Sequence, residues 1–132
     1  MNIVVDASVI FIAVIVDEPE KNVLVELTKG ADLIAPHSVH WEIGNAFSAM
    51  LKRKRIVLNQ GLRALEIYRN IPIKFLDVEL EESLKIADRL GIYAYAAYLI
   101  RCALKYKSPL IALDQNLVSF AKQMNVKVME VT

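Results

Sequence analysis

Two short apolar runs, one near each end of the chain, are each followed directly by an aspartate. The first is Ile3-Val4-Val5 before Asp6, and the second is Leu110-Ile111-Ala112-Leu113 before Asp114. Apolar runs without polar alternation are typical of parallel strands that are covered on both faces by helices. Ligands bind beyond the carboxyl ends of such strands, so we expect Asp6 and Asp114 to lie at one edge of a sheet.

The composition favours a single domain that spans residues 1–132. The chain has no Gly/Pro/Ser-rich linker, and a chain of this length buries roughly two thirds of its unfolded surface. Hydrophobic residues make up 55% of the sequence, which predicts either helices that are buried on several sides or an apolar face for a partner. Self-association is the first expectation.

The longest apolar segment runs from Ile3 to Val16 and contains only Asp6 and Ser8 as polar residues. It is shorter than the roughly 20 residues that span a bilayer, so we predict a core segment and no membrane association. A secretory signal would have a basic start and a small-residue cleavage pattern, and this segment shows neither. We therefore expect a cytoplasmic protein.

Cysteine and charge counts narrow the possible chemistry. Cys102 is the only cysteine, which argues against an internal disulfide or a cysteine-rich zinc site, and its helical apolar pattern predicts burial. Sixteen basic and fifteen acidic residues give a formal net charge of +1. This balance lacks the strong positive field of a general nucleic-acid binder, so any contact with nucleic acid must be local.

Hydrophobic periodicity and breaker residues predict alternating strands and helices. The predicted strands are Asn2–Asp6, Leu33–Ala35, Ile73–Leu76, Pro109–Leu113 and Val126–Val131. The predicted helices are Val9–Val16 with Ser8 as its cap, Glu20–Lys29, Ser38–Lys54, Asn59–Asn70, Glu79–Leu90, Tyr95–Tyr106 and Asn116–Met124. This order predicts an α/β fold, a three-layer α/β/α architecture with a mainly parallel central sheet and right-handed crossovers.

A third acidic residue, Glu42, falls within the apolar face of the predicted helix that begins at Ser38. That face is marked by Val39, Ile43, Ala46, Phe47 and Met50. The side chain of Glu42 should therefore point toward the sheet, where its charge needs compensation. An arginine or a loop cap would compensate it, and so would a divalent cation.

Three carboxylates at one edge of a sheet repel one another unless a cation holds them. Mg²⁺ and Mn²⁺ prefer oxygen ligands, lower the pKa of a bound water, and neutralise charge that develops on a phosphate. Asp6, Glu42 and Asp114 are therefore predicted to bind Mg²⁺ or Mn²⁺ and to catalyse phosphodiester hydrolysis. The alternative for each aspartate is that it only caps the helix that follows it.

Several other polar and aromatic residues have structural interpretations. Asp77 lies between a predicted strand and a predicted helix, which favours a capping role. His37 and His40 lack zinc-ligand spacing, and we expect neither to bind metal. The tyrosines at 93, 95, 98 and 106 are expected to pack in the core or in a dimer interface rather than to stack on bases.

The basic run Lys52, Arg53, Lys54 and Arg55 ends the helix that carries Glu42. Positive charge at a helix C-terminus is favourable in itself because it complements the helix dipole. The functional alternative is an RNA-binding site that contacts phosphate groups.

Four segments, taken in order, resemble PIN domains, specifically the VapC-type ribonuclease toxins of toxin–antitoxin pairs. They are Val5-Asp6-Ala7-Ser8, Glu42 with Asn45, Tyr95-Ala96-Ala97-Tyr98-Leu99, and Ala112-Leu113-Asp114-Gln115-Asn116-Leu117. The resemblance covers nearly the full chain. It implies a Mg²⁺- or Mn²⁺-dependent endoribonuclease that forms a homodimer and is inhibited by a cognate antitoxin, which inserts a segment near the active site.

Asp6, Glu42 and Asp114 match acidic positions of that family, and Ser8, Asn45 and Asn116 are candidate auxiliary residues. Two positions depart from the family pattern. Ala96 stands where such proteins usually carry another acid, and Ala112 stands where they often carry a threonine. The missing carboxylate lowers the negative charge around a cation and should lower metal affinity, with Asn116 as a partial substitute oxygen ligand.

Two functions therefore stay open. One is a metal-dependent endoribonuclease that acts on RNA as the toxin of a pair. The other is a PIN-fold protein without useful catalysis that acts through dimer or antitoxin binding. A phosphotransfer domain of the receiver or haloacid-dehalogenase kind lacks support, because Ser8 replaces the second aspartate of the latter and no acidic pair accompanies Asp6 as in the former.

Overall fold

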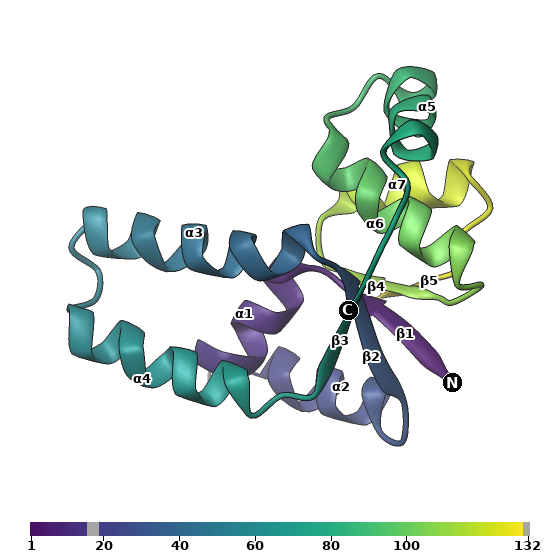
Figure 1. The fold of residues 1–132 in the computed structure, drawn as a ribbon. Coiled ribbons are helices and arrows are strands. Elements are labelled where there is room, and N and C mark those ends of the chain that lie inside the picture. Colours follow the sequence, from purple (N-terminus) through teal and green to yellow (C-terminus); the bar gives the residue numbers. More distant parts are fainter. Residues whose placement is uncertain (16–18, 131–132) are drawn as a thin grey trace.

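A computed structural model describes residues 1–15 and 19–130, with the side chains of residues 15 and 19–21 left out (Figure 1). The strands in this part of the chain are β1 (Asn2–Val5), β2 (Asp32–Pro36), β3 (Ile73–Leu76), β4 (Leu110–Ala112) and β5 (Val128–Glu130). The helices are α1 (Ala7–Ile15), α2 (Pro19–Thr28), α3 (Ser38–Lys52), α4 (Leu58–Arg69), α5 (Leu80–Leu90), α6 (Ala94–Lys105) and α7 (Gln115–Gln123).

The described boundaries lie within two residues of the predicted ones. The predicted ends at Val16 and Val131 fall outside the described residues. Agreement is close because local signals set these boundaries. Helix α5, for example, ends at Gly91, whose φ of +65° is a left-handed conformation that glycine adopts without steric cost.

The strands form one parallel sheet in the order β3-β2-β1-β4-β5 (Figure 1). Val4 of β1 pairs with Ile34 of β2 on one side and with Leu110 of β4 on the other. Helices α1 to α4 lie on one face of the sheet and α5 to α7 on the opposite face (Figure 1). The predicted three-layer α/β/α architecture is therefore confirmed.

The two apolar runs that predicted this architecture form its centre. Ile3, Val4, Leu110 and Ile111 are completely buried. The chain order reverses at β1, because β2 and β3 extend the sheet to one side whereas β4 and β5 extend it to the other. Ligand sites in open parallel sheets form at such a reversal, beyond the carboxyl ends of the strands. In the described part of the chain, no helix is both long and apolar enough to cross a membrane.

The prediction that Asp77 caps α5 is wrong. The N-cap position belongs to Glu79, and no side chain caps this helix. The Oδ1 atom of Asp77 lies 2.9 Å from Nε2 of His37, at the end of the neighbouring strand β2. Capping would require Asp77 to be next to the first helical residue, but two residues separate it from Leu80.

Two residues after the end of α3, Lys54 adopts a conformation that usually belongs to glycine. Lys54 has a φ of +57°, and its N–H donates to the carbonyl of Leu51 at 3.0 Å. The N–H of Arg55 donates to the carbonyl of Met50 at 2.9 Å. These bonds close the helix end, but a side chain with a Cβ is disfavoured in the left-handed region.

The replacement Lys54→Gly should therefore stabilise the protein. The left-handed conformation costs a residue with a Cβ about 1–2 kcal/mol, and the greater flexibility of glycine in the unfolded chain offsets about half of that gain. We expect the free energy of unfolding, measured by urea denaturation, to rise by about 0.5–1 kcal/mol. The control Lys52→Gly removes the same charge from a helical position and should destabilise by about 1 kcal/mol; equal effects of the two variants would contradict this account.

Candidate active site

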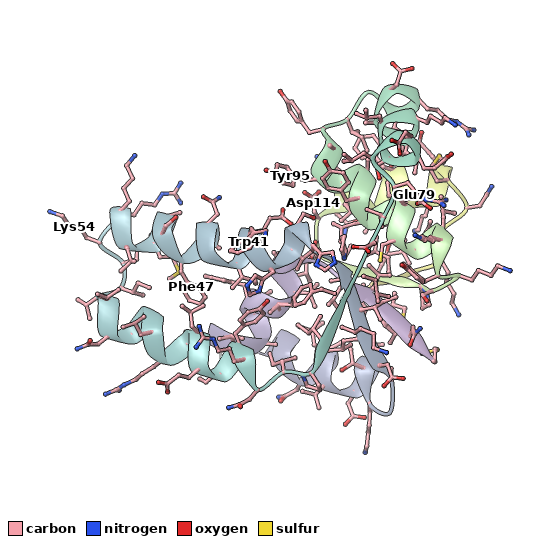
Figure 2. All side chains as sticks on the ribbon, in the orientation of Figure 1. Trp41, Phe47, Lys54, Glu79, Tyr95 and Asp114 are labelled. Atoms are coloured by element: carbon pink, nitrogen blue, oxygen red, sulfur yellow. The ribbon has the colours of Figure 1, made fainter. Side chains whose placement is uncertain are left out.

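A cavity of about 570 Å³ opens beyond the carboxyl ends of β1 and β4, between α1, α3 and α6. Asp6, Glu42 and Asp114 all line it, and Ser8 and Asn45 line it as well. The structure thus brings together three carboxylates that come from widely separated segments. Asn116 and the basic run from Lys52 to Arg55 are not among the lining residues. Figure 2 shows Asp114 and Tyr95 near the end of α3 that approaches α6.

Asp6 is both a helix cap and a wall of the cavity. Its Oδ1 accepts hydrogen bonds from the Ser8 hydroxyl at 2.8 Å and from the Val9 N–H at 3.0 Å. Asp6, rather than Ser8 as predicted, therefore caps α1, and Ser8 orients the cap. Both hydrogen bonds use Oδ1, so Oδ2 is the oxygen available to a ligand.

Asp114 repeats this arrangement at the start of α7. Its Oδ1 accepts from the N–H of Asn116 at 2.7 Å and from the N–H of Leu117 at 3.4 Å. Asn116 contributes its backbone to this cap, which accounts for its place in the sequence motif. Both aspartates therefore cap the helix that follows them and also line the cavity, so capping is not their only structural feature.

Glu42 lies on the side of α3 that faces this cavity and is half-buried. None of the ion pairs among the described residues involves Glu42. Burial, and secondarily the negative charge of Asp6, raise the pKa of Glu42 above its usual value. The arginine partner that would have given Glu42 a purely structural role is thus absent from the described part of the chain.

The charge of Asp6 is also disfavoured. Asp6 is only 7% exposed, and burial is the main cause that raises its pKa; the hydrogen bonds from Val9 and Ser8 lower the pKa, and the charge of Asp114 raises it. The cavity therefore holds negative charge that the described residues leave incompletely compensated.

The donor set suits a hard divalent cation. It consists of carboxylate oxygens together with the side-chain amide of Asn45, and Mg²⁺ and Mn²⁺ bind such oxygens. Among the described residues, no three His, Cys, Asp or Glu side chains converge closely enough to form a ready-made metal site. The carboxylates surround the cavity without meeting at one point, an arrangement that fits Mg²⁺ because this ion usually retains several water ligands.

Helix α6 supplies the wall opposite α3 through Tyr95 and Ala96. The position where related proteins usually carry another acid is therefore on the cavity itself. Two ion pairs connect α6 to the segment between β3 and α5. In that segment Glu79, labelled in Figure 2, lies 3.0 Å from Arg101 and 3.3 Å from Lys105 of α6. The hydrogen bond from Arg101 lowers the pKa of Glu79 to about 2.

Two of the four tyrosines do not pack in the core, so only the dimer-interface alternative of the expectation remains for them. Tyr93 is 90% exposed and Tyr95 is 60% exposed, whereas Tyr98 and Tyr106 are half-buried. Tyr95 packs edge-on against Tyr98, with ring centroids 6.2 Å apart. Whether Tyr93 and Tyr95 enter a dimer interface stays a prediction.

Sequence reasoning missed the apolar part of the cavity wall. Phe11, Ile12, Leu99 and Leu117 line it together with the carboxylates. In the sequence these residues follow the same helical periodicity as core residues, so no local signal separates them. Their presence explains why burial has the largest effect on the pKa of Asp6 and Glu42.

Comparison with known proteins identifies the family. A family model of the PIN domain matches residues 3–123. The chain belongs to the PIN domain family. This match covers most of the chain and confirms the resemblance to PIN domains inferred from the four short segments.

Three solved structures share this architecture at low sequence identity. The chain is similar to PAE2754 from Pyrobaculum aerophilum, with a TM-score of 0.75 and 20% identity over 99% of this chain and 92% of that one. It is also similar to VapBC2 from Rickettsia felis, which was solved bound to a DNA fragment from its promoter, with a TM-score of 0.66 and 13% identity over 98% of both chains. A PilT N-terminus domain protein, SSO1118 from Sulfolobus solfataricus P2, gives a TM-score of 0.50 and 14% identity over 99% of this chain and 87% of that one. No curated protein sequence matches the chain.

The two roles of Asp6 can be separated by mutation. Asn caps a helix as well as Asp does, so Asp6→Asn keeps the cap and removes the charge, whereas Asp6→Ala removes both. In EDTA at pH 7 we expect Asp6→Asn to be at least as stable as the parent protein and Asp6→Ala to be about 1 kcal/mol less stable than Asp6→Asn, measured by urea denaturation.

The pH dependence follows from the raised pKa of Asp6. Because the folded state disfavours the carboxylate, the parent protein gains stability relative to Asp6→Asn as the pH falls through the raised pKa toward the ordinary value of 3.8. The advantage of Asp6→Asn should therefore disappear near the lower end of that range. A constant difference between the two proteins from pH 7 to pH 4 would show that Asp6 does not carry a disfavoured charge.

Proposed function

We propose that this protein is a metal-dependent endoribonuclease and the toxin component of a toxin–antitoxin pair. The observation that carries the proposal is that Asp6, Glu42 and Asp114 line a single cavity at the reversal point of a parallel sheet. PIN domains are generally nucleases, so the family match supports phosphodiester hydrolysis as the reaction. RNA as the substrate and Mg²⁺ or Mn²⁺ as the cofactor are the finer parts of the proposal.

Asp6, Glu42 and Asp114 would hold the cation, with Asn45 as an additional oxygen donor. When bound, the cation supplies a water of lowered pKa and neutralises charge that develops on the phosphate. The protein holds the carboxylates in position. Ser8 and the N-terminus of α1 fix Asp6, the N-terminus of α7 fixes Asp114, and the apolar residues Phe11, Ile12 and Leu99 limit the water that reaches the cavity.

Two apolar surfaces are available for protein partners. A groove of about 390 Å³ lies between α1, α2 and α4, and its lining includes the exposed side chains Val25 and Ile67. On α5, Leu80 and Leu84 are each 61% exposed, one helical turn apart. We assign the groove to an antitoxin, in line with the similarity to VapBC2, and the α5 surface to a homodimer contact.

Removal of either the carboxylates or the metal should abolish RNA cleavage. Glu42→Gln keeps the size and hydrogen-bonding capacity of the side chain but removes its charge, so we expect cleavage of an RNA substrate with Mn²⁺ to fall by about a hundredfold or more. EDTA should abolish cleavage by the parent protein. The control Glu66→Gln changes an exposed glutamate of α4 in the same way and should be without effect; cleavage that survives both EDTA and Glu42→Gln would contradict the metal mechanism.

A specific observation favours a second function, a PIN-fold protein that binds partners without useful catalysis. Ala96 occupies a position on the cavity wall where the family usually supplies an acid. The variant Ala96→Asp distinguishes the two functions. A fourth carboxylate should raise Mn²⁺ affinity on the order of tenfold, measured by calorimetry, because affinity follows the charge of the ligand set.

Catalysis then decides between the two functions. Cleavage by the parent protein that Ala96→Asp increases favours the ribonuclease. Cleavage by Ala96→Asp alone favours a binding protein derived from a nuclease. Ala96→Asn, which has nearly the same size without the charge, is the matched control and should not raise Mn²⁺ affinity to the same extent.

A further inference from the structure

Helix α3 carries a line of exposed residues that reaches the cavity at Asn45. Trp41, Asn45, Ser48 and Lys52 follow one another in steps of four, three and four residues, so they lie on one side of the helix. All four are exposed. Asn45 also lines the cavity. This α3 track therefore extends from the cavity in both directions along the helix, toward Trp41 at one end and Lys52 at the other.

Trp41 is an unusual surface residue. It is the only tryptophan of the chain and is 74% exposed. Its ring packs against His40 in an edge-to-face arrangement, with centroids 4.9 Å apart, and His40 is in turn hydrogen-bonded to the hydroxyl of buried Tyr68 at 2.8 Å. The indole is thus supported on one side and open on the other, as a stacking platform for a base requires.

The opposite end of the track is strongly basic. Lys52, Arg53, Lys54 and Arg55 are consecutive and exposed in a chain whose formal net charge is only +1. None of the ion pairs among the described residues involves them. Figure 2 shows Lys54 at the end of α3 that lies far from Asp114, whereas Trp41 lies toward Asp114. Positive charge is therefore placed away from the carboxylates that would repel a phosphate backbone.

We propose that the α3 track binds single-stranded RNA, with a base stacked on Trp41, the phosphate backbone crossing the cavity beside Asn45, and further phosphates held by the basic run. This inference rests on the proposed ribonuclease function and specifies how the strand reaches the carboxylates. From Trp41 to Lys52 the helix rises by about 16 Å. That length matches about five nucleotides of a stacked strand at about 3.4 Å each.

The chemistry of the track favours RNA over a protein partner. A protein-docking surface of this kind would be a contiguous apolar patch, but the residues next along the track from Trp41 are polar. One exposed aromatic ring, amide and hydroxyl groups, and a run of cations together match a nucleic-acid strand, which offers both π-faces and phosphates. A single strand fits better than a duplex, since only unpaired bases present a free face to Trp41.

Binding can be measured without cleavage, in EDTA, with a fluorescein-labelled twelve-nucleotide oligouridylate and its duplex with oligoadenylate. We expect the single strand to quench Trp41 fluorescence and the duplex to leave it unchanged. Trp41→Ala should weaken single-strand binding on the order of 5- to 100-fold, the range for loss of one stacked base. Trp41→Phe should retain most of the affinity. Val23→Ala is the control, because Val23 is an exposed apolar residue of α2 that is not among the residues lining the groove assigned to the antitoxin.

The basic end of the track predicts a characteristic salt dependence. Lys52→Ala should reduce the slope of log affinity against log salt by about 0.7. Lys54→Gly, which suits the left-handed conformation at that position, should reduce it by the same amount. The exposed Lys127, which lies just before β5, serves as the control in Lys127→Ala and should leave the slope unchanged.

Two results would overturn the inference. One is that Trp41→Ala and Lys52→Ala bind the single strand as the parent protein does. The other is that Trp41→Ala lowers the molar mass in light scattering while RNA affinity is unchanged, which would assign the track to a protein interface. The proposed ribonuclease function fails separately, in the cleavage assays with Glu42→Gln, because binding in EDTA does not require the metal.

Discussion

The parallel pairing of β1 with β4 is the constraint on which the candidate site depends. Val5 pairs with Ile111, so the two strands end side by side and Asp6 and Asp114 follow at the same edge. Each aspartate then meets the N-terminus of the helix that its strand leads into. Because free N–H groups and the helix dipole favour negative charge there, the fold can keep two carboxylates close together.

The same arrangement disfavours the charged forms of the carboxylates in the site. Burial raises the pKa of both Asp6 and Glu42. The charge of Asp114 raises the pKa of Asp6 further and the charge of Asp6 raises that of Glu42, although hydrogen bonds from Val9 and Ser8 lower the pKa of Asp6. A cation with oxygen ligands would offset this effect. Without the ion, these carboxylates lower the stability of the folded protein. Such a loss of stability is common where a stable fold carries a reactive site.

Local signals made most of the fold predictable. Each strand or helix was marked by its own periodicity, and the two strand-end aspartates needed only the rule that parallel strands end at one edge. Glu42 was also predictable, because its place within an apolar helical face was visible in the sequence. The site could be assembled from three local patterns and one topological rule.

The failures concern residues whose environment depends on the packing of distant elements. Asp77 pairs with His37 because β2 and β3 end side by side, a contact that no local capping pattern can reveal. Tyr95 has the same helical spacing as a core residue, but the cavity leaves its side of α6 partly uncovered. Trp41, for which the sequence predicted no environment, is exposed because Val39, Ile43 and Phe47 form the buried face of α3 and Trp41 lies outside it.

Ala96 connects the two proposed functions through the charge of the cavity. An acid at this position would strengthen cation binding, but without the cation it would also increase the repulsion of a phosphate backbone that crosses the cavity. Under the two proposals, alanine at this position favours binding of RNA over binding of metal. The α3 track meets the cavity only at Asn45, so a change at Ala96 would alter cleavage while it leaves the proposed contacts at Trp41 and Lys52 intact. Metal affinity and RNA affinity would then depend on different parts of this surface, and the side chain at position 96 of α6 would set how strongly the two oppose each other.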